Sequence, residues 1–253
     1  RWEMNSYEKL IRILKRFGDP PYEMGITELS KEMGVSKSGI HKIIRSLVRE
    51  SLLVQNPSTR KYSLDPVVFR LGNVYSDSKG IWDVSHTIMH SLADRTGASV
   101  LIGIREGDDP ILAYKLGIGD KYIYQGQTGS RFPFNAGALG KLLTAFLPED
   151  RIRRILKTRN IEKKTPYTET DPEKLMEEYW KIKKQGYAVS IEENLIGAFG
   201  MAAPIRDRHG NVWACLSLVG PKETFTPDVV DLWLSLLRNG ADEISSRLGF
   251  RGV

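Results

Sequence analysis

Basic and hydrogen-bonding side chains cluster between Ser36 and Lys61, and their types and spacing predict contact with a nucleic acid. The segment carries six Lys and Arg residues and a single acid, Glu50. Such cations neutralise backbone phosphates, which supplies affinity without reading sequence. Bases would be read by the first turns of a helix that enters the major groove. The residues expected to contact DNA are Ser36, Lys37, Ser38, Gly39, His41, Lys42, Arg45, Arg60 and Lys61.

Two short helices joined by a tight turn at residues 33–35 are predicted to position these side chains. The first covers residues 27–33, and the second follows Ser36, a favourable N-cap, and continues to Glu50. One face of the second helix is apolar and the other is basic, as a recognition helix requires, although an ordinary surface helix can show the same pattern. The apolar positions expected to face a core are Ile40, Ile44, Leu47 and Val48.

A predicted β-hairpin after the second helix favours the recognition-helix interpretation. Residues 52–54 and 61–64 have strand character, and the segment 56–59 between them is typical of a turn. A helix-turn-helix followed by such a hairpin is a winged helix. A further helix at residues 5–17 would pack behind it, and its buried stripe is expected to comprise Tyr7, Leu10, Ile11, Leu14 and Phe17.

Length, charge and cysteine content set the frame for the rest of the chain. The 253 residues, 41% of them hydrophobic, are enough for two domains. The net charge is +6, and the part up to Asp65 holds twelve Lys and Arg against eight Asp and Glu, so the basic excess is concentrated there. A single cysteine, the lack of a signal peptide and the lack of a membrane-length apolar run fit a cytoplasmic protein.

The chain is expected to divide into a winged-helix domain (1–65), a linker helix (66–80) and a second domain (81–253). Gly72 weakens the prediction of the linker helix at 67–77. The second domain mixes helices and strands, which indicates an α+β fold with a central, largely antiparallel sheet. Its strands are predicted at 99–105, 111–115, 121–124, 187–191, 199–206 and 212–219, and its helices at 81–96, 136–146, 150–157, 171–185 and 227–247.

Two pairs of side chains have the right chemistry for a metal or for acid–base work, but their spacing argues against both. His86 and His90 are four residues apart on a helix, with no third ligand in a metal pattern, so a surface or subunit-interface role is favoured. Glu192 and Glu193 are adjacent, and on a strand they would point to opposite faces rather than form an acid–base pair.

The candidate nucleophiles are equally weak. Cys215 lies in an apolar strand, which is typical of an inert core thiol, and Ser217 has no histidine arranged to activate it. We therefore expect no catalytic residues, no metal and no cofactor. A metabolic enzyme with an attached winged helix is the alternative, and it would require turnover of a bound metabolite.

Five blocks of sequence resemble the IclR family of bacterial transcriptional regulators. They are LSKEMGVSKSGIHKIIRSL, SRFPFNAGALGKLLTAFLP, KKQGYAVSIEEN, MAAPIRDRHGNVWACLSLVGP and EISSRLG, and the resemblance extends over nearly the full length of the chain. The resemblance implies a winged helix, a linker helix and a GAF-like effector domain. It also implies homodimers that commonly pair into tetramers, a palindromic double-stranded DNA operator, and control of a small catabolic operon by a metabolite.

The resemblance also implies where the metabolite would bind, between the sheet and the loop that opens the GALGK helix. The N-terminus of that helix offers backbone N–H groups and a positive dipole, which suit a carboxylate. A tight loop-to-helix packing point is the alternative interpretation of this segment. The effector-binding residues carried over are Tyr124, Phe132, Asn135, Gly137, Ala138, Leu139, Ser190, Ala198, Gly200 and Ser217.

The sequence departs from the family where the ligand would be held. Many members have an aspartate near Ser190 and an Arg-Cys pair at the positions of Phe199 and Gly200. Without them the pocket loses a charge and a thiol, so a larger or more hydroxylated acid, such as a sugar acid, is as compatible as a small one. Gly39 stands where Thr is common in the recognition helix. A repressor is favoured over an activator, although the sequence does not separate the two.

Overall fold

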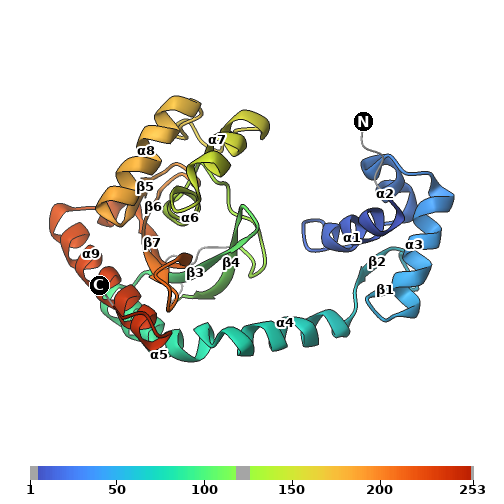
Figure 1. Cartoon of the computed structure of the whole chain (residues 1–253), viewed down its shortest axis with the longest axis horizontal. Helices are drawn as coiled ribbons and strands as arrows, with labels where there is room; N and C mark the ends of the chain where they lie inside the picture. The colour runs from blue at the N-terminus through green and yellow to red at the C-terminus, as the bar shows by residue number, and fades with distance from the viewer. Residues whose placement is uncertain (1–4, 118–125, 252–253) are drawn as a thin grey trace. The chain divides into compact units, whose positions relative to one another are not determined.

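The computed structural model describes residues 5–117 and 126–251, which fall into two compact units, Arg1–Lys79 and Gly80–Val253 (Figure 1). In the first unit, α1 (Ser6–Arg16), α2 (Ile26–Met33) and α3 (Lys37–Arg49) precede a hairpin of β1 (Leu53–Gln55) and β2 (Tyr62–Leu64). This order is the predicted winged helix-turn-helix.

Local capping explains where the first helices begin and end. The side chain of Asn5 accepts hydrogen bonds from the backbone N–H groups of Tyr7 and Glu8 at the start of α1. Gly34 takes the left-handed conformation, with a φ of 65°, and so ends α2. Ser36 caps α3 by accepting from the N–H of Gly39 at 3.2 Å. The tight turn between α2 and α3 therefore follows from residues within three positions of each other.

The core of the first unit corrects the predicted stripe of α1. Ile13 and Phe17 are buried, whereas Tyr7 is 80% exposed and Ile11 is 55% exposed. The helix packs through Leu10, Ile13, Leu14 and Phe17, which follow the spacing of one helical face, while Tyr7 and Ile11 lie on its flank. In α3, Ile40, Ile44 and Leu47 are buried as predicted, but Val48 is 37% exposed because it lies one position beyond that face.

Helix α4 (Pro66–Lys79) runs through Gly72 without interruption. Pro66 suits the first position of a helix, where its missing N–H costs nothing, and Gly80, with a φ of 61°, separates α4 from the next helix. The helix is therefore longer than predicted, and its apolar side chains Phe69, Leu71, Val74 and Tyr75 are exposed.

The second unit is built on an antiparallel sheet, which confirms the predicted α+β class. Within the described ranges its strands follow the order β4-β3-β7-β6-β5. The predicted strand at 121–124 lies outside the described residues. The strand bounds are β3 (Ser99–Glu106), β4 (Asp109–Leu116), β5 (Ala188–Ile191), β6 (Ala198–Arg206) and β7 (Val212–Pro221).

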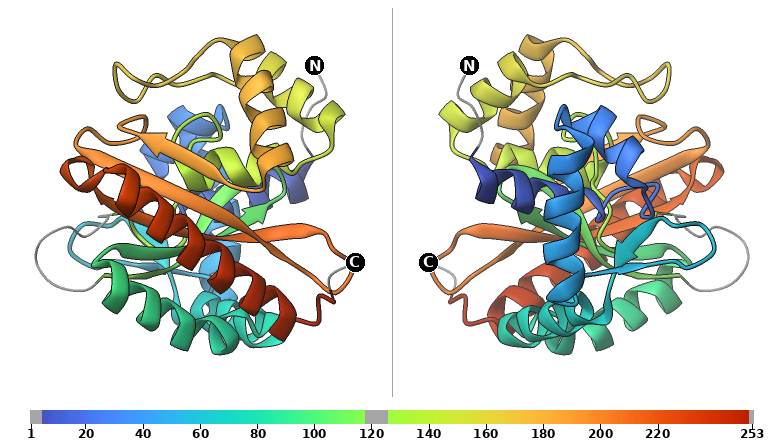
Figure 2. Two further views of the ribbon diagram at one scale, coloured as in Figure 1. Left: turned by 90° about the vertical axis from the view of Figure 1, so that its left-hand side faces the viewer. Right: turned by 90° about the vertical axis from the view of Figure 1, so that its right-hand side faces the viewer.

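Helices cover both faces of the sheet and enclose two separate cores. Helices α5 (Ile81–Thr96) and α9 (Pro227–Arg247) pack on one face, where α9 lies along β6 and β7 (Figure 2). Helices α6 (Ala138–Ala145) and α8 (Pro172–Gln185) pack on the other face, and α7 (Glu149–Thr158) packs against α8. Every residue of α6 is buried, so this helix is a central layer between the sheet and α8. No helix in the described part of the chain has the length and apolarity needed to span a membrane.

Cys215 lies in β7 and is fully buried, which raises the pKa of its thiol to about 12. A thiol with this pKa carries almost no thiolate at neutral pH, so it should not react as a nucleophile. We expect native protein at about pH 8 to leave a thiol-reactive chromogenic disulfide untouched over an hour, and protein unfolded in guanidinium to react within minutes. Stoichiometric reaction of the native protein would show that the core around β7 opens readily.

Candidate nucleic-acid interface and ligand cavity

The outer face of α3 presents the polar residues that the sequence singled out. Ser36, Lys37 and Ser38 are exposed at the start of the helix, and Gly39 is half-buried because its N–H faces the cap. His41, Lys42 and Arg45 are exposed along the next two turns. The buried side chains on the opposite face hold the helix to its own unit. The structure therefore brings the predicted recognition residues of α3 onto one solvent-facing surface.

Of the two basic residues of the hairpin, Arg60 is exposed to solvent and Lys61 is held in an ion pair. Arg60 is exposed at the tip, where its backbone has a φ of 60° and its carbonyl accepts from the side chain of Gln55 at 3.0 Å. The Nζ atom of Lys61 instead lies 2.9 Å from Oε1 of Glu28, on α2. Lys61 is therefore engaged inside its own unit, a partnership between residues far apart in sequence that no local pattern indicated.

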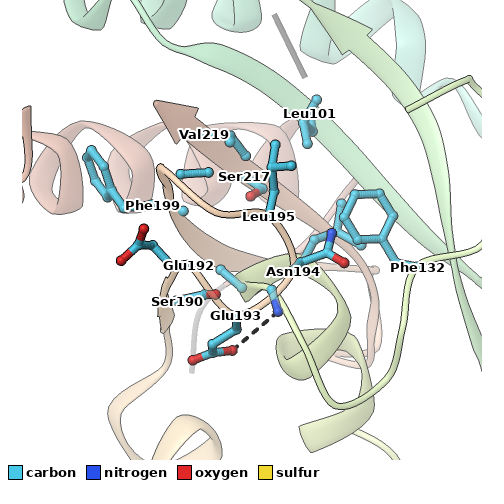
Figure 3. Close-up of a pocket in the computed structure, with 15 residues that line it drawn as sticks. Leu101, Phe132, Ser190, Glu192, Glu193, Asn194, Leu195, Phe199, Ser217 and Val219 are labelled. Carbon is cyan, nitrogen blue, oxygen red and sulfur yellow. Dashed lines mark hydrogen bonds between the residues drawn. The ribbon is translucent and has the colours of Figure 1, made fainter. Parts of the chain in front are cut away.

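A cavity of about 40 Å³ lies in the second unit between α6 and strands β5, β6 and β7 (Figure 3). The loop at 192–197 contributes to the wall, and the cavity is partly open to solvent. The lining residues are Leu101, Phe132, Gly137, Ala138, Leu139, Ser190, Glu192, Glu193, Asn194, Leu195, Ala198, Phe199, Gly200, Ser217 and Val219.

Most of the effector-binding residues carried over from the family resemblance meet at this cavity. Tyr124 lies outside the described residues. Asn135 does not line the cavity: it is buried, and its amide donates to the carbonyls of Glu162 at 3.0 Å and Glu169 at 3.1 Å. Its side chain thus holds the segment before α8 in place. The residues that do line the cavity are Phe132, Gly137, Ala138, Leu139, Ser190, Ala198, Gly200 and Ser217.

The hydroxyl of Ser217 is already engaged by the backbone. Its Oγ donates to the carbonyl of Met201 at 2.7 Å, and the residue is 1% exposed. Ser190, also buried, lies next to Glu193 and opposes the rise in its pKa. Ser217 therefore forms part of the cavity wall. The polar side chains of the cavity lie at the end near Ser190.

The prediction that Glu192 and Glu193 point to opposite faces of a strand is wrong. Strand β5 ends at Ile191, and Glu192 has a φ of 56° at the start of a tight turn that returns the chain to β6. Both glutamates line the cavity. Sequence reasoning missed them as site residues, although Gly197, which has a φ of 75°, was a signal that the segment turns.

Glu193 occupies the N-terminus of α6, where the sequence placed the carboxylate of a ligand. Its Oε2 accepts from the N–H of Gly137 at 3.3 Å, and its Oε1 lies 2.6 Å from Nζ of Lys141 (Figure 3 shows the bond to Gly137). Lys141 is fully buried and also pairs with Glu178 of α8 at 2.5 Å. Burial raises the pKa of Glu193, and the neighbouring Lys141 opposes that rise.

The loop at 192–197 is tied to the rest of the unit on both sides of the cavity. Glu192 forms an ion pair with Lys222 and accepts from the N–H of Gly197 at 2.9 Å. The hydroxyls of Thr165 and Thr168 each donate to backbone carbonyls of the loop at 2.6 Å. These ties hold Asn194 and Leu195 over the cavity, although Leu195 is 46% exposed.

His86 and His90 lie side by side on α5, with their Nε2 atoms 3.2 Å apart. Trp82 packs edge-on against His86, at 5.0 Å between ring centroids. Among the described residues no group of three or more His, Cys, Asp or Glu is arranged to hold a metal ion.

The sequence matches two families that together cover almost the whole chain. Residues 6–57 match the IclR helix-turn-helix domain, and residues 74–246 match the family described as Bacterial transcriptional regulator IclR C-terminal. The chain is 31% identical over 251 residues to the HTH-type transcriptional regulator XynR of Escherichia coli K12, covering 98% of each protein.

Two solved structures share the fold over nearly their full length. An IclR transcriptional regulator from Alicyclobacillus acidocaldarius superposes with a TM-score of 0.83 at 25% identity, covering 98% of this chain and 100% of the other. An IclR homologue from Microbacterium hydrocarbonoxydans, complexed with 4-hydroxybenzoate, superposes with a TM-score of 0.78 at 20% identity, covering 96% and 99%. The families matched are those of transcriptional regulators rather than enzymes. With its basic recognition helix and its cavity-bearing C-terminal unit, the chain belongs to the IclR family of DNA-binding transcriptional regulators.

Proposed function

We propose that this protein is a repressor of a small catabolic operon, released from its operator by a small organic or sugar acid bound in the cavity beside α6. The observation that carries the proposal is the exposed, basic outer face of α3 on a well-packed winged helix, in a chain whose second unit contains a cavity. Cations on such a face bind phosphate, and the first turn of α3 is free to read bases.

The acid is inferred from the chemistry at the start of α6. The first N–H groups of a helix have no acceptor within the helix, and the helix dipole is positive there. The backbone N–H groups of Ala138 and Leu139 can therefore bind a carboxylate. The related structure bound to 4-hydroxybenzoate shows that one protein of this fold takes a carboxylate ligand. The largely apolar wall, with Phe132 and Phe199, suits a small organic acid.

A homodimer is the proposed binding form, and exposed apolar side chains support it. Tyr7 and Ile11 on α1, and Phe69 and Val74 on α4, are more than half exposed, and covering them with a second copy would remove apolar surface from water. A dimer carries two recognition helices and reads half-sites about one helical turn apart on a palindromic operator. An acid that binds the two states of the dimer unequally would change that spacing and release DNA.

The proposal is tested by fluorescence anisotropy of labelled DNA from upstream of the protein's own gene. We expect nanomolar to micromolar binding at fixed salt, and release when a panel of organic and sugar acids is added. Binding that strengthens with an acid would make the protein an activator or a co-repressed regulator, and would contradict acid-induced release. Binding that no acid alters would contradict control by an acid.

A further inference from the structure

The cavity contains more negative than positive charge. Of the described residues that line it, Glu192 and Glu193 are the ones that ionise with a full charge, and neither Lys nor Arg is among them. Glu192 is neutralised by its ion pair with Lys222 at the rim. Glu193 forms an ion pair with the buried Lys141, and Glu178 pairs with the same lysine. Two carboxylates thus share one lysine beside the cavity.

The carboxylate of Glu193 therefore occupies part of the anion-binding position at the N-terminus of α6. The N–H of Gly137 and the Nζ of Lys141 are both bonded to Glu193, so a ligand carboxylate would use the next N–H groups and lie close to a second carboxylate. Like charges at such short range in a partly desolvated site repel each other. A plain carboxylate ligand therefore binds at a disadvantage.

A hydroxyl beside the ligand carboxylate removes this disadvantage. An ionised glutamate has about four lone-pair positions for hydrogen bonds, and Glu193 uses only part of them on Gly137 and Lys141. A hydroxyl donates to a carboxylate in a charge-assisted bond, which is stronger than a neutral one. An unsubstituted acid has no such donor and forms no bond of this kind with Glu193.

We propose that Glu193 makes this cavity selective for hydroxy acids, whose carboxylate binds the first turn of α6 and whose neighbouring hydroxyl donates to Glu193. The inference rests on the proposed acid effector and specifies its class. Unsubstituted acids of the same length bind more weakly because they bring a second carboxylate without a donor. Hydroxylation, rather than size alone, decides which acids bind.

Matched pairs of acids test the selectivity on the full-length protein. Calorimetric titration would compare propionate with lactate, butyrate with 3-hydroxybutyrate, and hexanoate with gluconate, which differ mainly in their hydroxyl groups. We expect the hydroxylated member of the responding pair to bind at least tenfold tighter. Equal binding within every responding pair would overturn the selectivity and leave the acid effector standing. No binding of any acid would overturn the acid effector and the selectivity together.

Two variants separate a contact with the ligand from a disturbance of Lys141. Glu193→Gln removes the charge inside the cavity, and we expect it to reduce the preference within the pair to threefold or less, partly because the unsubstituted acid gains. Glu178→Gln removes the other carboxylate from the same lysine but lies outside the cavity wall, so it should keep the preference. If both variants lose the preference for the hydroxylated acid, the selectivity depends on Lys141, and the proposed role of Glu193 is wrong. If Glu193→Gln does not fold, the wild-type pairs alone decide.

Discussion

Replacing Lys42 or Arg45 by alanine is expected to lower the affinity for operator DNA by roughly tenfold each, with little change in melting temperature. Both side chains are exposed on the outer face of α3, and the core beneath them is formed by other residues. A phosphate contact would be lost evenly across DNA sequences, and the slope of log affinity against log salt would fall by about 0.9 for each contact removed. Anisotropy titrations at several salt concentrations measure both quantities.

Arg49→Ala is the matched control for these two variants. Arg49 is also an exposed cation on α3, but it lies in the last turn of the helix, where its Nε is 3.3 Å from Glu50. We expect its removal to change affinity by less than about twofold, since the first turns of a recognition helix make the base contacts. Equal losses for all three variants would indicate a general charge effect, and wild-type affinity in both test variants would refute the recognition-helix assignment.

Gly140→Ala should destabilise the protein by about 3 kcal/mol or more, the largest effect on folding that we expect from one methyl group. A Cβ atom built on Gly140 would lie 2.0 Å from the carbonyl oxygen of Pro133, and that oxygen belongs to the backbone. Helix α6 would have to move away from the segment that carries Phe132, and the cavity wall would move with it. Guanidinium unfolding of the full-length protein, followed by far-UV circular dichroism, measures the loss.

Gly72→Ala is the control for Gly140→Ala, and we expect it not to lower the free energy of unfolding. Gly72 is also inside a helix, but a Cβ atom there would have no neighbour within 4 Å. Alanine is a better helix former than glycine by up to about 1 kcal/mol, so this variant should be neutral or more stable. A similar loss in both variants would mean that the contact with Pro133 is not the cause of the effect at Gly140.

The winged helix and the α+β class were predictable because their signals are local. Ser36 caps α3 through a bond to a residue three positions away, and Gly34 ends α2 by its own backbone conformation. The buried positions Ile40, Ile44 and Leu47 follow the period of one helix. Patterns of this kind depend on neighbours in sequence, so the sequence by itself determined the elements of the first unit, the polar outer face of α3 and the family.

Tertiary structure alone decided which groups control the cavity. Glu193 meets Lys141 and Gly137 across more than fifty residues of sequence, and Asn135 is drawn away from the cavity to the carbonyls of Glu162 and Glu169. The exposed flank of α1 likewise depends on how that helix is rotated against its core. The local sequence allows a side chain several possible partners, and only the folded structure determines which of them it contacts. For that reason the acidic character of the cavity beside α6 emerged only from the folded chain.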